Sequence, residues 1–163
     1  ADGWRRGVAF IKEIVPRSAI ALVARKLYDE NFVAHPMRST IELDESASLP
    51  KRVEYAWNDA RGWHRLEVCK LSPPTIPARG SLEEFITEHY WGYTARRDGR
   101  TSEYRVEHPP WRVSLAANAE FCCDVGSVYG SAFNECLTPP PKSVFLAEGS
   151  AVAVYPGSTI AHS

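Results

Sequence analysis

The residues that could do chemistry gather on the two arms of one predicted β-hairpin. Asp98–Gly99 is the clearest turn signal in the 163-residue chain and predicts a two-residue type I′ loop. Such a loop pairs Tyr93 with Tyr104 and Trp91 with Val106. Directly opposed residues share a face of the sheet with their Cβ atoms about 5 Å apart. The turn therefore predicts an aromatic face.

Continued to the bases of both arms, the same pairing brings together four side chains suited to proton transfer or binding. It sets His89 opposite His108 and Tyr90 opposite Glu107. The two imidazoles end the aromatic face, which we interpret as an aromatic core layer, as a ligand-binding wall with a general base, or as a metal site. Two histidines without a carboxylate or cysteine on their face give the metal interpretation little support, so no metal or other cofactor is predicted.

The opposite face of the predicted hairpin is charged. It places Arg105 between Glu103 and Glu107 on one strand. Two interpretations are open: a salt-bridged outer surface, or a buried acid–base pair in which desolvation raises the pKa of Glu88 and Glu107 beside Tyr90.

Composition narrows the classes of function. The formal net charge of −1 shows no excess of basic residues of the kind that binds nucleic acid. The longest apolar run, Ala19–Ala24, is too short to span a bilayer. The four cysteines lack the spacing of a disulfide framework or a zinc site, which is typical of reduced thiols in a cytoplasmic protein. A vicinal redox switch at Cys122 and Cys123 is the alternative. No nucleophile motif is present.

The elements that must position these residues are mostly short strands without βαβ alternation. Helices are expected at Ser18–Tyr28, Ser81–Thr87 and Asp124–Leu137, where a capping residue precedes helical apolar spacing. The expected fold is α+β and mainly β, an antiparallel, strongly curled sheet or barrel with three peripheral helices, forming a single domain over residues 1–163. Besides the hairpin arms, strands are expected at Gly7–Val15, Met37–Leu43, Val53–Trp57, Trp63–Cys69, Trp111–Ala116, Val144–Ala147 and Ala151–Tyr155.

Several stretches resemble known families. The run Ala19–Leu27, after a strand and a proline, resembles a segment of acetoacetate decarboxylase. A closer resemblance is to the YqjF-like family, a domain of unknown function in the acetoacetate-decarboxylase-like superfamily. That resemblance runs in order along almost the whole chain, at Gly3–Val8, Leu27–Asn31, Pro36–Arg38, Thr87–Tyr93, Tyr104–Trp111 and Phe145–Ser150.

The resemblance implies where a pocket would lie. The segment Tyr28–Phe32 falls where the superfamily builds its pocket, which makes Arg25, Tyr28 and Asn31 candidates for ligand binding. Arg25 would suit a substrate carboxylate through bidentate pairing. An ordinary i,i+4 bridge to Asp29 explains the same arginine equally well.

The Schiff-base lysine of acetoacetate decarboxylase has no counterpart. Alignment on proline puts Met37 and Arg38 at its place, and no lysine occurs between Lys26 and Lys51. Imine formation needs a neutral amine, and an arginine stays protonated. Decarboxylation through an imine is therefore not expected.

The expected function is a small-molecule domain that binds or acts on a small organic acid or carbonyl compound, with the question of catalysis open. The alternative is a non-catalytic module for an apolar ligand or a protein partner. Because members of the resembled families are larger at the N-terminal side, we also expect a homo-oligomer or association with an absent N-terminal segment.

Overall fold

The computed structural model describes residues 5–16, 32–43, 50–96 and 98–160. The chain divides into two compact units, which are described separately. The first unit comprises Ala1–Ala34, Ile76–Arg112 and Glu148–Ser163, and the second comprises His35–Thr75 and Val113–Ala147.

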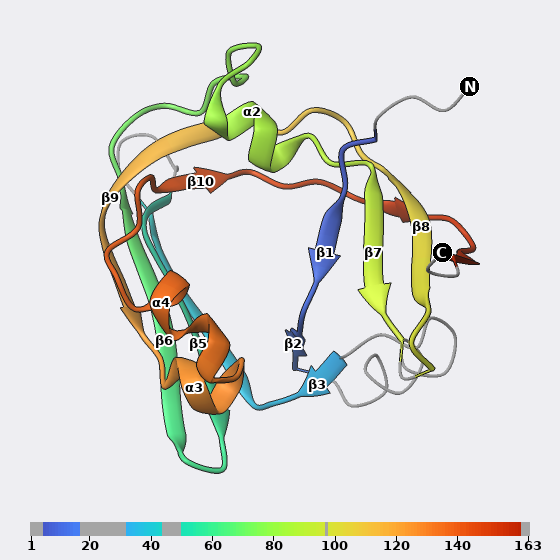
Figure 1. Cartoon of the computed structure of the whole chain (residues 1–163). Coiled ribbons are helices and arrows are strands. Elements are labelled where there is room, and N and C mark those ends of the chain that lie inside the picture. Colours follow the sequence, from blue (N-terminus) through green and yellow to red (C-terminus); the bar gives the residue numbers. More distant parts are fainter. Residues whose placement is uncertain (1–4, 17–31, 44–49, 97, 161–163) are drawn as a thin grey trace. The chain divides into compact units, whose positions relative to one another are not determined.

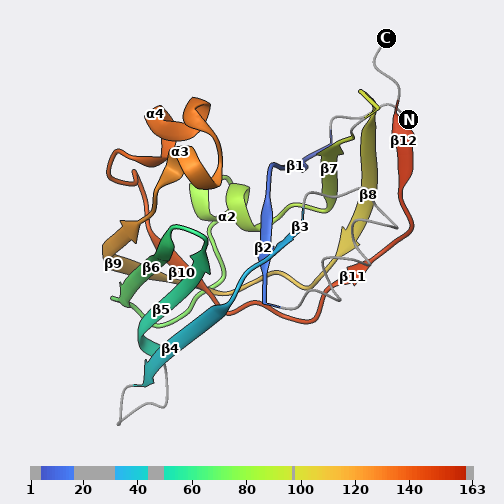
Figure 2. The same cartoon turned by 90° about the horizontal axis from the view of Figure 1, so that it is seen from below.

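The first unit is built on the hairpin of β7 and β8. Parallel to β7 runs β1, while β11 and β12 both pair antiparallel with β8, at opposite ends of it (Figures 1 and 2). A separate parallel pair, β2 and β3, completes the strands described in this unit. The bounds are β1 (Val8–Phe10), β2 (Glu13–Val15), β3 (Phe32–Ala34), α2 (Leu82–Thr87), β7 (Trp91–Ala95), β8 (Thr101–Glu107), β11 (Ala153–Val154) and β12 (Ser158–Ile160).

The second unit is an antiparallel five-stranded sheet in the order β10-β9-β6-β5-β4. One face carries an ion-pair network in which Arg52 contacts Glu42, Glu54 and Glu67. The other face contributes the buried Val53 and Trp57. The bounds are β4 (Met37–Leu43), β5 (Pro50–Asp59), β6 (Gly62–Lys70), β9 (Val113–Cys122), α3 (Val125–Val128), the 3₁₀ helix η1 (Ser131–Phe133), α4 (Asn134–Leu137) and β10 (Phe145–Ala147).

The fold class is confirmed as mainly β and mainly antiparallel, and the strand Met37–Leu43 has the predicted bounds. The expected strand Gly7–Val15 is instead two short strands, β1 and β2, and each makes a parallel pair that the sequence did not indicate. Within the described residues the sheets are open, so closure into a barrel stays a prediction.

Two of the three predicted helices fall on described residues. At α2 the cap is as predicted, because Ser81 Oγ accepts a hydrogen bond from the Glu84 backbone at 3.1 Å. The expected continuous helix Asp124–Leu137 is wrong: Asp124 caps α3, but Gly130 has φ +102°, which a right-handed helix cannot accommodate. The segment is therefore divided into α3, η1 and α4. The third predicted helix, Ser18–Tyr28, lies outside the described residues.

The predicted register of the β7–β8 hairpin is wrong by one residue. Tyr93 pairs with Glu103, and Trp91 pairs with Arg105. The cause is the length of the loop. Arg96 N–H donates to the Arg100 carbonyl at 2.9 Å, so three positions, 97 to 99, separate the two arms, and not the two positions that a type I′ loop would have. Positive φ occurs at Gly99 and not at Asp98, as in three-residue hairpin loops with a left-handed glycine.

In this register the aromatic residues that were predicted to share one face of the sheet lie on opposite faces. Tyr104 lies on the buried face with Gly92, whereas Trp91 and Tyr93 lie on the other face with Glu103. The change of register does not leave Glu103 as a charge without a partner, because Glu103 is paired with Arg5 at 3.1 Å.

Glycine is required at position 92 because the Tyr104 ring lies across it. A Cβ atom built on Gly92 would stand 2.3 Å from Tyr104 Cζ and 2.7 Å from its hydroxyl oxygen. An aromatic ring covering a strand glycine is a device that fixes strand register.

A β-bulge bends the long strand β9. Glu67 pairs with Glu120 and Cys69 with Ala117, so two residues of β9 oppose the single Val68 of β6. Asn118, in the bulge, has φ +51° and is the non-glycine residue with positive φ in the described chain. Asparagine tolerates this backbone better than most residues.

Substitution of Gly92 by alanine should lower the free energy of unfolding by roughly 1–3 kcal/mol, because the added methyl group overpacks the Tyr104 ring. Urea denaturation measures this cost. In a Tyr104→Leu background the ring atoms are gone, and the same substitution should cost clearly less. Equal costs in both backgrounds would contradict the packing described.

The left-handed backbone of Asn118 gives a second prediction. Asn118→Val should destabilise the protein by about 1–2 kcal/mol, since in the left-handed conformation the Cβ atom of a β-branched residue lies too close to the following carbonyl oxygen. Asn118→Gly should keep or raise the wild-type stability. Thermal or urea unfolding compares the two, and a valine variant as stable as the glycine variant would show that the bulge is not formed.

Candidate functional site

Helix α2 positions one side of the candidate site. Besides the Ser81 cap, the Gly80 backbone N–H donates to Glu84 Oε2 at 2.8 Å, which turns the Glu84 side chain back over the start of the helix. This backbone donor and the nearby Arg6 lower the pKa of Glu84, so its carboxylate is ionised at neutral pH. The helix ends at Thr87, and the chain passes through Glu88 and Tyr90 into β7.

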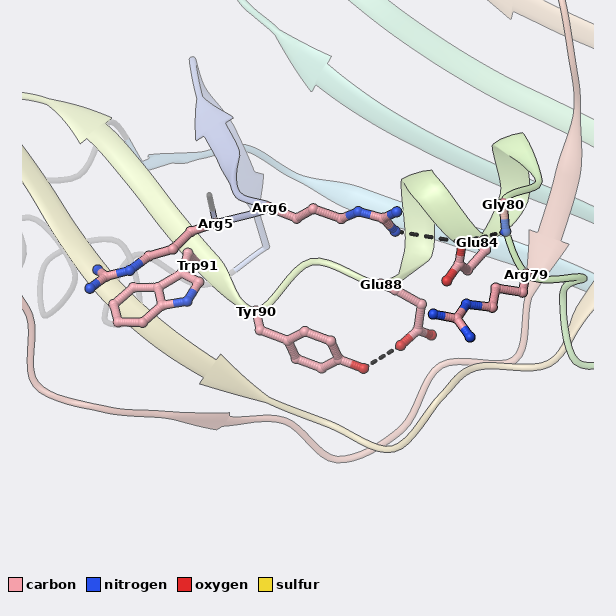
Figure 3. Close-up of a pocket in the computed structure, with 8 residues that line it drawn as sticks. All are labelled: Arg5, Arg6, Arg79, Gly80, Glu84, Glu88, Tyr90 and Trp91. Atoms are coloured by element: carbon pink, nitrogen blue, oxygen red, sulfur yellow. Dashed lines mark hydrogen bonds and ion pairs between the residues drawn. The ribbon is translucent and has the colours of Figure 1, made fainter. Parts of the chain in front are cut away.

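A pocket of about 560 Å³ opens between the start of β7, α2 and the residues that precede β1. We call it the arginine pocket; Figure 3 shows its lining. Its volume is in the range of small-molecule sites. The lining residues are Arg5, Arg6, Arg79, Gly80, Glu84, Glu88, Tyr90 and Trp91.

The three arginines of this pocket differ in how they are engaged. Arg5 lies over the Trp91 ring at 4.2 Å and pairs with Glu103. Arg6 pairs with Glu84 at 3.6 Å. Arg79 is exposed and makes no ion pair or hydrogen bond to the residues that the structure describes. Figure 3 shows its guanidinium directed toward the Glu88 carboxylate.

Tyr90 and Glu88 form a hydrogen-bonded pair within the pocket. The Tyr90 hydroxyl donates to Glu88 Oε2. This bond is the largest cause that raises the pKa of Tyr90 to about 12, and desolvation of the hydroxyl is the second. Tyr90 is therefore a protonated donor at working pH and not a base. The other carboxylate oxygen, Glu88 Oε1, is buried without a partner in the described structure.

The candidates predicted from sequence are placed as follows. Arg25, Tyr28 and Asn31 lie outside the described residues. His89 packs edge-on against Phe85, with ring centroids 5.4 Å apart, and its Nδ1 lies 2.9 Å from the Ile86 carbonyl oxygen. The predicted pairing of His89 with His108 is not formed.

Tyr90, Glu107 and His108 line cavities. Tyr90 belongs to the arginine pocket, whereas Glu107 and His108 line a second cavity of about 540 Å³. We call this the histidine pocket, lined by Glu107, His108, Pro109, Ala151, Val152 and Ala153. The Tyr90 ring stacks on the His108 ring at 5.1 Å, in place of the expected pairing of Tyr90 with Glu107.

Sequence reasoning missed the arginines that define the first pocket. Arg5 and Arg6 are adjacent, but Arg79 is far from them in the chain, and the three match no motif. The available signal was Arg79–Gly80 directly before the capping box, since a cation there lies beside the acidic first turn of α2.

The described residues contain no group of three or more His, Cys, Asp or Glu side chains arranged to hold a metal ion. None of the described helices is long and apolar enough to cross a membrane.

The Tyr90–Glu88 bond predicts a titration result. Glu88→Gln should lower the Tyr90 pKa from about 12 toward the ordinary value of about 10, because the bond to the carboxylate is the largest cause of its rise. NMR of ¹³Cζ-labelled tyrosine near pH 10.5 measures the ionised fraction, with Tyr90→Phe assigning the signal. Tyr155, whose pKa is raised by Glu107, is the internal control. An unchanged Tyr90 titration would mean that the bond is not formed.

Comparison with known proteins places the chain in a family. Searches of curated proteins and of solved structures each gave no match. A scan against family models matched DUF2071, described as an uncharacterized conserved protein, over residues 1–151. Since that match covers most of the 163 residues, the chain belongs to the DUF2071 family of uncharacterized conserved proteins.

Proposed function

We propose that the chain is a small-molecule domain of the acetoacetate-decarboxylase-like kind that binds a small organic acid in the arginine pocket. The observation that carries the proposal is Arg79, a cation at a pocket of about 560 Å³ with no carboxylate paired to it in the described structure. A ligand carboxylate would supply the missing partner through two parallel N–H···O bonds.

The ion pairs around the pocket engage two of its three arginines. Three guanidinium groups line it with two carboxylates, and a third carboxylate, Glu103, already neutralises Arg5. Glu84 is held by Arg6 and by the Gly80 backbone. Glu88, the other lining carboxylate, balances Arg79 in formal charge, but it is hydrogen-bonded to Tyr90, and no ion pair joins it to Arg79 in the described structure. Arg79 is thus the arginine of this pocket without an ion pair, and an arginine keeps its charge throughout the working pH range.

The chemistry available in this pocket supports binding more than covalent catalysis. No lysine is among the lining residues, and Tyr90 is held as a protonated donor. Tyr90 and the arginines can orient an acid and stabilise negative charge on it. Imine formation is not part of the proposal.

The rival function is a non-catalytic module that binds an apolar ligand or a protein. Leu82, Phe85 and Ile86, at positions i, i+3 and i+4 of α2, are exposed by 49%, 53% and 45% and would provide such a surface. The polar lining of the adjacent pocket favours the acid, because an apolar ligand would leave its charged groups without partners.

Binding of propionate, acetoacetate and succinate, measured by isothermal titration calorimetry, tests the proposal. At least one acid should bind saturably. Arg79→Gln should weaken that binding about ten-fold or more, as expected for loss of a charge-assisted hydrogen bond. Arg61→Gln is the matched control, because Arg61 is an exposed arginine in the other unit.

Equal affinities for the Arg79→Gln variant and the control would exclude the arginine pocket as the acid site. If none of the acids binds to the wild type, the proposed function is wrong. Binding of a hydrophobic dye that is lost in Phe85→Ser would then favour the rival.

A further inference from the structure

His108 stacks on two aromatic rings. Its ring stacks on Tyr90 with centroids 5.1 Å apart and on Trp111 with centroids 4.4 Å apart, both within 30° of parallel. Trp111 is itself fixed, since its Nε1–H donates to Ser150 Oγ at 2.8 Å. With two rings stacked on it, the imidazole offers a polar ligand its edge.

One side of that edge is already occupied. His108 Nδ1 lies 2.9 Å from the Pro109 carbonyl oxygen. Because a carbonyl oxygen only accepts, Nδ1 carries the hydrogen, and in the neutral ring Nε2 is the acceptor. Within the described structure Nε2 has no hydrogen-bond partner, and it is not one of the buried unpaired atoms. It therefore reaches the surface as an accessible acceptor.

The histidine pocket around this ring offers little other polarity. Glu107, the second titratable residue that lines it, has both carboxylate oxygens engaged: Oε2 accepts from the Tyr155 hydroxyl at 2.6 Å, and Oε1 accepts from Arg105. The rest of the lining is Pro109 and the wall of Ala151, Val152 and Ala153. A charged ligand would find no free counter-ion here, whereas an apolar body would be well matched.

We propose that the histidine pocket is a second binding site, separate from the arginine pocket, for a small uncharged molecule that joins an apolar body to one O–H or N–H donor. The donor binds His108 Nε2 in the plane of the imidazole, and the apolar body lies against Pro109 and the wall of residues 151–153. The two stacking rings fix the direction of Nε2, which makes the site selective for a donor in one position. This site does not depend on the function proposed for the arginine pocket.

Phenol and anisole are the matched probes, because anisole keeps the apolar ring and lacks the O–H donor. Long-range ¹H–¹⁵N NMR of the full chain follows the histidine ring nitrogens during titration with each probe. His108→Phe keeps an aromatic ring between Tyr90 and Trp111 but removes Nε2. His89→Phe is the matched control, since His89 lies outside the pocket lining.

The expected result is an unprotonated Nε2 on His108 in the free protein, and a saturable shift of that nitrogen with phenol in the wild type and in His89→Phe. Anisole should bind at least five-fold more weakly. In His108→Phe, where binding is followed by the ¹H signals of the probes themselves, the difference between the two probes should be lost. The proposal is overturned by a His108 whose Nδ1 is the unprotonated nitrogen, by phenol and anisole binding alike to the wild type, or by no saturable shift at all.

Discussion

The contact of the Tyr104 ring with the bare backbone of Gly92 is the constraint on which the first unit depends. It requires these two residues to face each other, and it thereby sets every other pair of β7 and β8. With that register, Trp91 and Glu103 lie on the opposite face, where both meet Arg5. One wall of the arginine pocket is therefore a consequence of a packing contact on the other side of the same strand.

Tyr90 connects the two pockets of the first unit. Its hydroxyl donates to Glu88 within the arginine pocket, and its ring covers one face of His108 in the histidine pocket. The backbone at Tyr90 continues the β7–β8 pairing, because its carbonyl accepts from Val106 N–H at 2.9 Å. Both pockets thus depend on one side chain that the strand pairing holds in place, and a shift of Tyr90 would change both.

The buried histidine of the second unit shows what a structural histidine looks like in this protein. His64 is only 5% exposed, its Nε2 lies 3.1 Å from Asp59 Oδ2, and its Nδ1 accepts from the Asp124 backbone at 3.3 Å. The pKa of Asp59 is lowered, first by the Arg61 backbone N–H and then by His64. Both nitrogens of His64 face protein groups that link β5, β6 and the start of α3. His108, in contrast, uses one nitrogen for the backbone carbonyl of the next residue, Pro109, and leaves the other accessible.

The sequence by itself determined the features that depend on neighbours a few residues away. The Ser81 cap and the Asp124 cap are local hydrogen bonds, and the alternation of Met37–Leu43 is a local pattern, so each could be read from the chain. The mainly antiparallel class followed from the same kind of signal. The composition of the first pocket did not, because Arg5 and Arg79 are brought together only by folding.

Only the tertiary structure decided the register of the hairpin and the length of the last helix. Asp98–Gly99 is compatible with loops of two or three residues, and the choice depends on cross-strand packing at Gly92 and Tyr104, which a turn motif does not contain. Likewise, helical spacing continues through Gly130, but the positive φ of Gly130 prevents α3, which ends at Val128, from continuing. A one-residue change in register moves each side chain of one strand to face different partners, so the aromatic face predicted from the turn was lost although its residues were correctly located in strands.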